Sequence, residues 1–165
     1  MSTAAELPPW KEALDAIVGA RAHGQSGEIL PRLQKLDAAF PHVAEINFQM
    51  GWTCEVLGRA EEAISYYDQA IALGLAPNEH SGALIGLGSC LRVIGQLERS
   101  ASVLQSGRSQ FPANREFDAF LALTLYAQNQ PREAMRLMVE VLCETTEDPG
   151  LTAYQRTLRH AVAAL

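Results

Sequence analysis

The stretch that decides the fold is "GWTCEVLGRAEEAISYYDQA", residues 51–70. It is an amphipathic pattern in which small residues recur at Gly51, Gly58, Ala63 and Ala70. Gly51 lies inside the apolar helical pattern, where a glycine costs about 1 kcal/mol relative to alanine. A helix that keeps this glycine must need a small side chain at that position.

The same rhythm of small and large residues returns twice further along the chain. A shift of 37 residues places Gly51 on Gly88, and a further shift of 34 places it on Ala122. Large apolar residues also recur: one position of the pattern holds Tyr67, Leu104 and Met138 in turn. A fixed period of this length is typical of a helical repeat protein.

The period resembles the tetratricopeptide repeat, a helix–turn–helix unit of about 34 residues. The segment "AEINFQMGWTCEVLGRAEEAISYYDQAIAL" (44–73) matches well, and the segments at 81–112 and 115–142 match fairly. The tryptophan often found at the fourth position of the unit is replaced in the three segments by Asn47, Leu84 and Asp118. Residues 43–160 are most similar to the small stand-alone bacterial proteins of tetratricopeptide repeat group 5. This resemblance implies an all-α fold, a short right-handed solenoid of antiparallel helix pairs.

The small residues have a physical explanation in such a unit. Two packed helices approach to about 8–10 Å, a distance set by the side chains at the crossing. We expect Gly51 and Ala63 at this crossing, where a larger side chain would push the helices apart. Gly58 follows the last helical turn, where a residue with positive φ is favoured. Asn129 at the matching place fits, since asparagine tolerates this conformation.

The domain organisation follows from prolines and small polar residues that mark helix borders. We expect one domain over residues 1–165, ending in a capping helix that begins after Asp148. Its parts would be a degenerate repeat at 8–42, repeats at 44–77, 81–114 and 115–148, and the capping helix at 149–165. The helices would span about 9–22, 28–39, 43–57, 60–73, 79–94, 97–110, 114–128, 131–143 and 150–163, with a break at "HGQSG" (23–27) and Pro31 in the first turn of the second helix.

Composition excludes several classes of function. The chain has 165 residues, 48% of them hydrophobic and 19% charged, with a net charge of −6. Lysine and arginine are scattered, so neither a nucleic-acid nor an anionic-membrane surface is expected. The N-terminus has no signal-peptide pattern and no apolar run reaches the length of a membrane span, which favours the cytoplasm. Three widely spaced cysteines predict free, partly buried thiols, and no cofactor or metal site is expected.

A candidate binding groove comes from the helix positions that point away from the partner helix of each repeat. These positions hold an apolar stripe with a few charges: Phe48, Trp52, Glu55, Ile85, Arg92, Leu123 and Tyr126. The stripe has the aromatic anchors and polar rim of a groove for a segment of another protein. Alternatively, neighbouring repeats and the N-terminal helix bury it. Arg92 would pair with a carboxylate of the partner or simply with Glu55.

The sequence therefore predicts a protein–protein interaction module without catalysis. It would bind an unidentified protein or peptide in the concave groove, with Trp52 as the favoured anchor. The alternative is a self-assembling structural protein, because exposed apolar repeat faces often drive self-association. An enzyme would need a cluster of perturbed titratable groups, and no such constellation is visible in the sequence.

Overall fold

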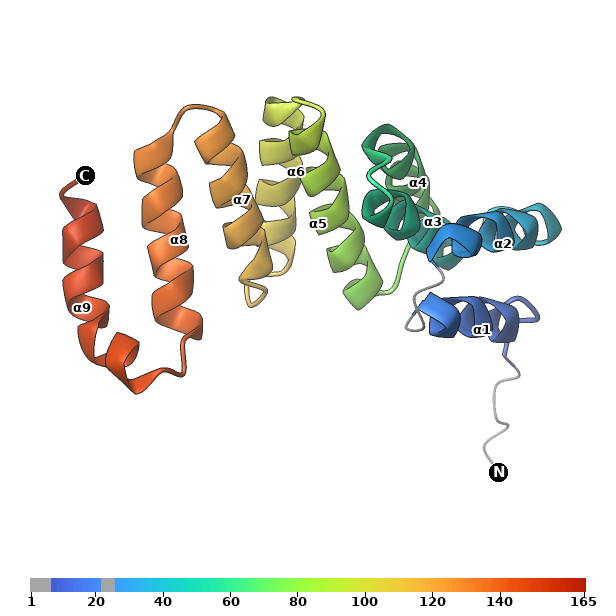
Figure 1. Cartoon of the computed structure of the whole chain (residues 1–165), viewed down its shortest axis with the longest axis horizontal. Helices are drawn as coiled ribbons and strands as arrows, with labels where there is room; N and C mark the ends of the chain where they lie inside the picture. Colours follow the sequence, from blue (N-terminus) through green and yellow to red (C-terminus); the bar gives the residue numbers. More distant parts are fainter. Residues whose placement is uncertain (1–6, 22–25) are drawn as a thin grey trace. The chain divides into compact units, whose positions relative to one another are not determined.

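The computed structural model describes residues 7–21 and 26–165, and all regular elements within these ranges are α-helices (Figure 1). The nine helices of this described part are α1 (Lys11–Arg21), α2 (Ser26–Ala39), α3 (Ala44–Val56), α4 (Ala60–Leu73), α5 (Pro77–Val93), α6 (Leu97–Gln110), α7 (Glu116–Ala127), α8 (Pro131–Thr145) and α9 (Pro149–Ala163). The predicted all-α fold is confirmed.

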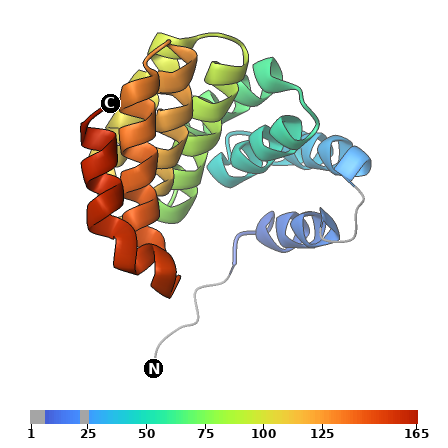
Figure 2. The same ribbon diagram turned by 60° about the vertical axis from the view of Figure 1, so that its left-hand side comes forward.

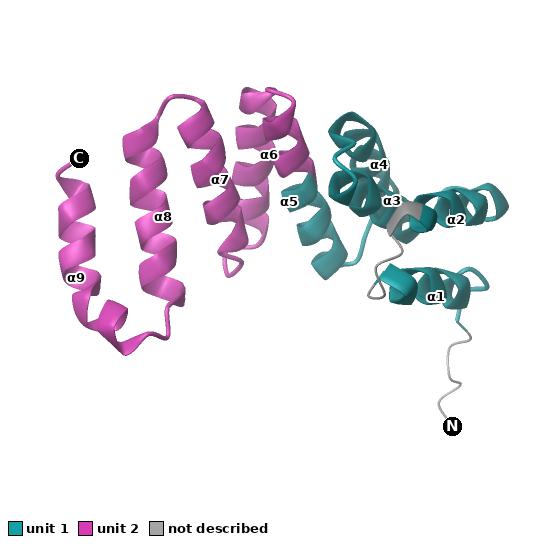
Figure 3. Cartoon of the chain, viewed as in Figure 1, with its two compact units in different colours: residues 1–86 teal, residues 87–165 magenta. Residues whose placement is uncertain are grey.

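The chain divides into two compact units, with the boundary inside α5 (Figure 3). Unit 1 comprises residues 1–86 and unit 2 residues 87–165. In unit 1, α1 packs on α2, α2 on α3 and α3 on α4. In unit 2, α6 packs on α7, α7 on α8 and α8 on α9. In these pairs each helix thus contacts its neighbour in sequence, as antiparallel helical repeats require, while the predicted boundaries of the individual repeats stay a prediction.

In unit 1, Tyr67 of α4 explains the glycine inside α3. The ring of Tyr67 is 2% exposed. A Cβ atom added to Gly51 would lie 2.8 Å from its Cδ1, and one added to Gly86 would overlap its other side. The small residue at Gly51 therefore allows a close helix crossing, as predicted, and the nearest side chain across it is Tyr67. The tyrosine hydroxyl donates a hydrogen bond of 2.7 Å to Glu55 Oε2.

Unit 2 uses the same arrangement with different side chains. A Cβ atom on Gly88 would lie 2.6 Å from Leu104 Cγ, and one on Gly107 would overlap the ring of Phe117. Ser100 occupies the position that Ala63 holds in the repeat at 44–77, and it is fully buried. Its hydroxyl donates 2.7 Å to the Gly88 carbonyl oxygen. Small residues in both units therefore let helices approach closely.

The turns between paired helices have the predicted backbone. Gly58, Gly95 and Asn129 have φ values of 73°, 81° and 63°. After each of them, the next backbone N–H bonds back over the helix end, for example from Arg59 to the Cys54 carbonyl oxygen at 2.8 Å. This satisfies carbonyl groups that the helix end leaves free. The predicted role of Gly58 and Asn129 is confirmed, and Gly95 adopts the same conformation.

Helix starts follow the sequence signals, with one correction. Asp148 accepts a hydrogen bond of 2.8 Å from the Leu151 backbone N–H, and Pro149 opens α9 as expected. The second helix begins at Ser26 rather than near residue 28, so Pro31 lies at its sixth position and not in its first turn. The helix accepts the loss of one backbone hydrogen bond there. The predicted break at 23–27 lies mostly outside the described residues.

Candidate protein-interaction surface

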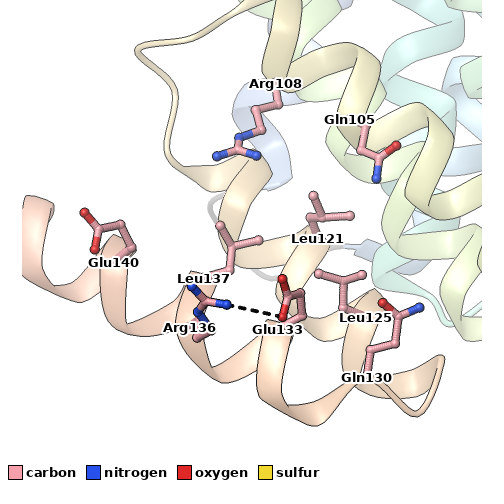
Figure 4. Close-up of a pocket in the computed structure, with 9 residues that line it drawn as sticks. All are labelled: Gln105, Arg108, Leu121, Leu125, Gln130, Glu133, Arg136, Leu137 and Glu140. Atoms are coloured by element: carbon pink, nitrogen blue, oxygen red, sulfur yellow. Dashed lines mark ion pairs between the residues drawn. The ribbon is translucent and has the colours of Figure 1, made fainter. Parts of the chain in front are cut away.

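A cleft of about 530 Å³ lies in unit 2 among α6, α7 and α8 (Figure 4). It combines three leucines with polar and charged side chains: Gln105, Arg108, Leu121, Leu125, Gln130, Glu133, Arg136, Leu137 and Glu140. Its charges are balanced from within the unit. Arg136 lies 3.8 Å from Glu133, and Arg159 of α9 lies 3.0 Å from Glu140. The hydrogen bond from Arg159 lowers the pKa of Glu140.

The opposite side of the same helices is apolar. Residues two apart in a helix point to nearly opposite sides. Leu123 therefore points away from the cleft residue Leu121, and Met135 away from the cleft residue Leu137. We call this surface the apolar face of unit 2, and it consists of Leu123 and Tyr126 on α7, Met135, Met138 and Leu142 on α8, and Tyr154 on α9. These three helices lie side by side (Figures 1 and 2).

The side chains of this face are open to solvent. Their exposed fractions range from 36% at Met138 to 69% at Tyr126. Single exposed apolar residues are ordinary on a protein surface, but several on adjacent helices indicate an interaction site. Helix α9 does not cover these side chains, because it packs on another part of α8. There Gln155 Nε2 donates a hydrogen bond of 2.6 Å to the Cys143 carbonyl oxygen.

An ion network around one buried carboxylate joins α7 and α8, which carry most of the face, to α6. Asp118 of α7 is 1% exposed. Its carboxylate lies 2.6 Å from Arg108 Nε of α6 and 2.7 Å from Arg115 Nη1. Arg115 also lies 2.6 Å from Glu144 of α8. One buried carboxylate thus links α6, α7 and α8.

The structure divides the predicted groove residues between the two units. Unit 1 contains Phe48, Trp52, Glu55 and Ile85, and unit 2 contains Arg92, Leu123 and Tyr126. Leu123 and Tyr126 share one side of α7 and belong to the apolar face. Arg92 has a buried Nε with no hydrogen-bond acceptor among the described residues. Whether these residues form one groove stays a prediction.

In unit 1, the favoured anchor Trp52 is partly covered by the chain itself. Its side chain is 43% exposed, and the Arg21 guanidinium lies 4.3 Å from the ring centroid. Arg21 also donates to Thr53 Oγ1 at 2.7 Å and to Gln49 Oε1 at 2.8 Å. Burial lowers the pKa of Arg21. Residue Arg21 therefore ties α1 to α3 across one face of the indole ring.

The other predicted residues of unit 1 are engaged internally. Glu55 accepts the Tyr67 hydroxyl, and Ile85 is only 9% exposed. The ring of Phe48 is half-buried, 6.2 Å from the ring of Tyr67 between centroids. Of the four, Trp52 presents the largest apolar surface to solvent.

Replacing Arg21 by alanine is expected to expose Trp52 further. The change removes the cation–π contact and the three hydrogen bonds that the Arg21 side chain donates, which together contribute about 1–3 kcal/mol. In a Trp10→Phe background, the Trp52 fluorescence maximum should shift to the red and the urea midpoint should fall. Arg32→Ala removes an exposed arginine of α2 and is the matched control. An unchanged emission maximum in the Arg21 variant would contradict the expectation.

Comparison with known proteins decides the family. The sequence model described as "Tetratrico peptide repeat" matches residues 44–165. The chain belongs to the tetratricopeptide repeat family. No curated protein sequence matches it significantly. The family and the fold are consistent with a protein–protein interaction module.

Solved structures of other tetratricopeptide repeat proteins share the fold. The structure of MamA residues 41–end from Desulfovibrio magneticus RS-1 has a TM-score of 0.72 at 22% identity, covering 94% of this chain and 89% of that one. PilF of Pseudomonas aeruginosa has a TM-score of 0.70 at 16% identity, covering 95% and 72%. A chain of the APC/C hetero-tetramer Cut9–Hcn1 has a TM-score of 0.76 at 14% identity, covering 90% and 29%. At these identities the likeness shows the fold alone.

The three cysteines are free and buried, and burial raises the pKa of the Cys54 thiol. Within the described ranges, no group of three histidine, cysteine or acidic residues is placed to hold a metal ion. The described helices include none that is long and apolar enough to span a membrane.

Sequence reasoning missed two features of the site. The buried network could have been found from Asp118, because an acid at a position usually filled by a large apolar residue needs cationic partners. The exposure of Met135 and Met138 had no comparable signal, since apolar residues at helical spacing are usually core.

Proposed function

We propose that this protein is a protein-interaction module and that the apolar face of unit 2 is its docking surface. The observation that carries the proposal is the exposure of six large apolar side chains on three adjacent helices. A segment of a protein chain that covered them would remove this apolar area from water, and each fully buried side chain contributes about 1.5–3 kcal/mol.

The composition of the face suits such a role. Tyr126 and Tyr154 offer rigid aromatic surface with a polar end, which is favoured at protein interfaces. Met135 and Met138 are flexible and adapt their shape to an apolar partner. The charged cleft on the other side of α8 is internally balanced, so we assign docking to the apolar side. This proposal requires no reaction.

Unit 1 supplies a second predicted contact. Trp52 belongs to the groove predicted from the sequence, and Arg21 leaves one side of its ring accessible. We rank Trp52 below the apolar face because it is a single large exposed residue, and the neighbouring predicted residues contact other side chains of unit 1.

A site-specific photo-cross-linking experiment tests the docking surface. A photoreactive phenylalanine analogue is placed at Met138 or, as control, at the exposed Ser109 of α6. In extract of the source cells, Met138 is expected to give discrete protein adducts and Ser109 none. Tyr126→Asp should abolish the Met138 adducts without changing the helical circular dichroism. Equal adduct patterns at both positions would contradict the proposal.

A further inference from the structure

We infer that the occupant of the apolar face is a second copy of this chain, docked about a two-fold axis. The inference rests on the proposed docking surface and names its partner. A two-fold interface must be self-complementary, because the same patch is used by both copies. Two features make the apolar face self-complementary: unit 2, which carries it, has no net charge, and opposite charges lie at the two ends of the face.

The net charge of the chain is confined to unit 1. Residues 1–86 contain 5 lysines and arginines against 11 acids, whereas residues 87–165 contain eight arginines and eight acids. Unit 2 is therefore neutral, with histidine uncharged. Charged copies repel each other, and proteins with no net charge associate more readily. An interface formed by unit 2 alone carries no net charge on either copy.

Opposite charges flank the two ends of the apolar face. Glu116 precedes Leu123 by seven residues and Arg132 precedes Met135 by three. Residues at these spacings share one side of a helix, so both charges lie on the same side of their helices as the apolar face. Both are exposed. The ion pair of 2.6 Å between Arg115 and Glu144 places the start of α7 beside the end of α8. Because α7 and α8 are antiparallel, Glu116 and Arg132 lie at opposite ends.

A two-fold axis that lies in the plane of the face, perpendicular to α7 and α8, brings these opposite ends together. It places Glu116 of one copy beside Arg132 of the other, and it makes this contact twice. Arg132 forms no ion pair with any residue that the structure describes, so its guanidinium is available to a second copy. Glu116 accepts only a hydrogen bond of 3.2 Å from the exposed Asn114 amide in the described part. The charges thus determine how the two copies are oriented, while the apolar side chains provide most of the contact area between them.

A charge-swap experiment tests this arrangement in the purified full chain. Sedimentation equilibrium should show a monomer–dimer equilibrium for the wild type at about 10–100 μM. Glu116→Arg and Arg132→Glu should each weaken dimerisation by about tenfold, because each creates two like-charge contacts. An equimolar mixture of the two variants should dimerise about as well as the wild type, because all contacts in the mixed pair are attractive again. Tyr126→Asp should be monomeric, and Val56→Asp, which alters an exposed apolar residue of unit 1, should dimerise normally.

The outcomes separate this inference from the proposed function. A wild-type chain that is monomeric at about 100 μM overturns the inference, and so does a mixture that dimerises no better than either variant alone. If Met138 then still cross-links to a different protein in extract, the docking surface stands and only the second copy is wrong. If neither self-adducts nor foreign adducts form at Met138, both fail.

Discussion

Replacing Asp118 by alanine is expected to lower the free energy of unfolding by about 3–5 kcal/mol. The carboxylate is 1% exposed and lies between Arg108 and Arg115. Its removal leaves Arg115, which is only 24% exposed, and the half-exposed Arg108 without the carboxylate that they share. Urea unfolding followed by circular dichroism measures the change, and hydrogen exchange should show the loss of protection in α6, α7 and α8.

A surface acid in the same unit provides the control. Glu133 lies 3.8 Å from Arg136, and both side chains are more than half exposed. An exposed pair of this kind contributes about 0–1 kcal/mol, so Glu133→Ala should leave the urea midpoint almost unchanged. If Asp118→Ala were as mild as Glu133→Ala, the network would not be what holds these helices together.

Replacing Gly107 by alanine is expected to destabilise the chain by about 3 kcal/mol, at the upper end for overpacking. The added methyl group would overlap the ring of Phe117, which is fully buried and stacks on Phe111 at 6.1 Å between centroids. No rotation of a fully enclosed ring gives the methyl group room without displacing α7 from α6.

A second variant shows that the effect comes from this contact. Phe117→Leu shortens the side chain that opposes Gly107 and is itself destabilising. In that background, adding Gly107→Ala should cost less than about 1 kcal/mol, because neighbouring substitutions are not additive. A cost that is equal in both backgrounds would trace the effect to helix propensity or another neighbour.

The fold could be predicted because its determinants are local and periodic. Gly51 and Gly88 mark close crossings, and Gly58, Gly95 and Asn129 adopt the positive φ that ends a helix. These requirements act on single residues at fixed spacing, so one sequence reveals them. The start of α2 was less predictable. The helix begins at Ser26 and so contains Pro31 beyond its first turn, where a proline is usually not found.

The docking surface could be predicted only in part. Leu123 and Tyr126 follow from helix geometry and are exposed as expected of a binding surface. Met138 occupies the position that Tyr67 holds in unit 1, and the pattern therefore indicates core. Tyr67 is 2% exposed and Met138 36%, because α9 packs on α8 through other residues. The position of a terminal helix depends on contacts that periodicity does not encode.

The environment of Trp52 shows a second limit of sequence reasoning. Arg21 reaches its ring from a helix about thirty residues earlier, and nothing in the repeat pattern links the two positions. Pairing of this kind is determined by the packing of α1, whose sequence departs from the repeat.

All basic side chains of unit 2 other than His160 are arginines, whereas the lysines of the chain, Lys11 and Lys35, both lie in unit 1. Guanidinium groups keep their proton throughout the physiological range, and they are not substrates for lysine acylation. Enzymes that acetylate amines can thus make the chain more acidic only at its first half.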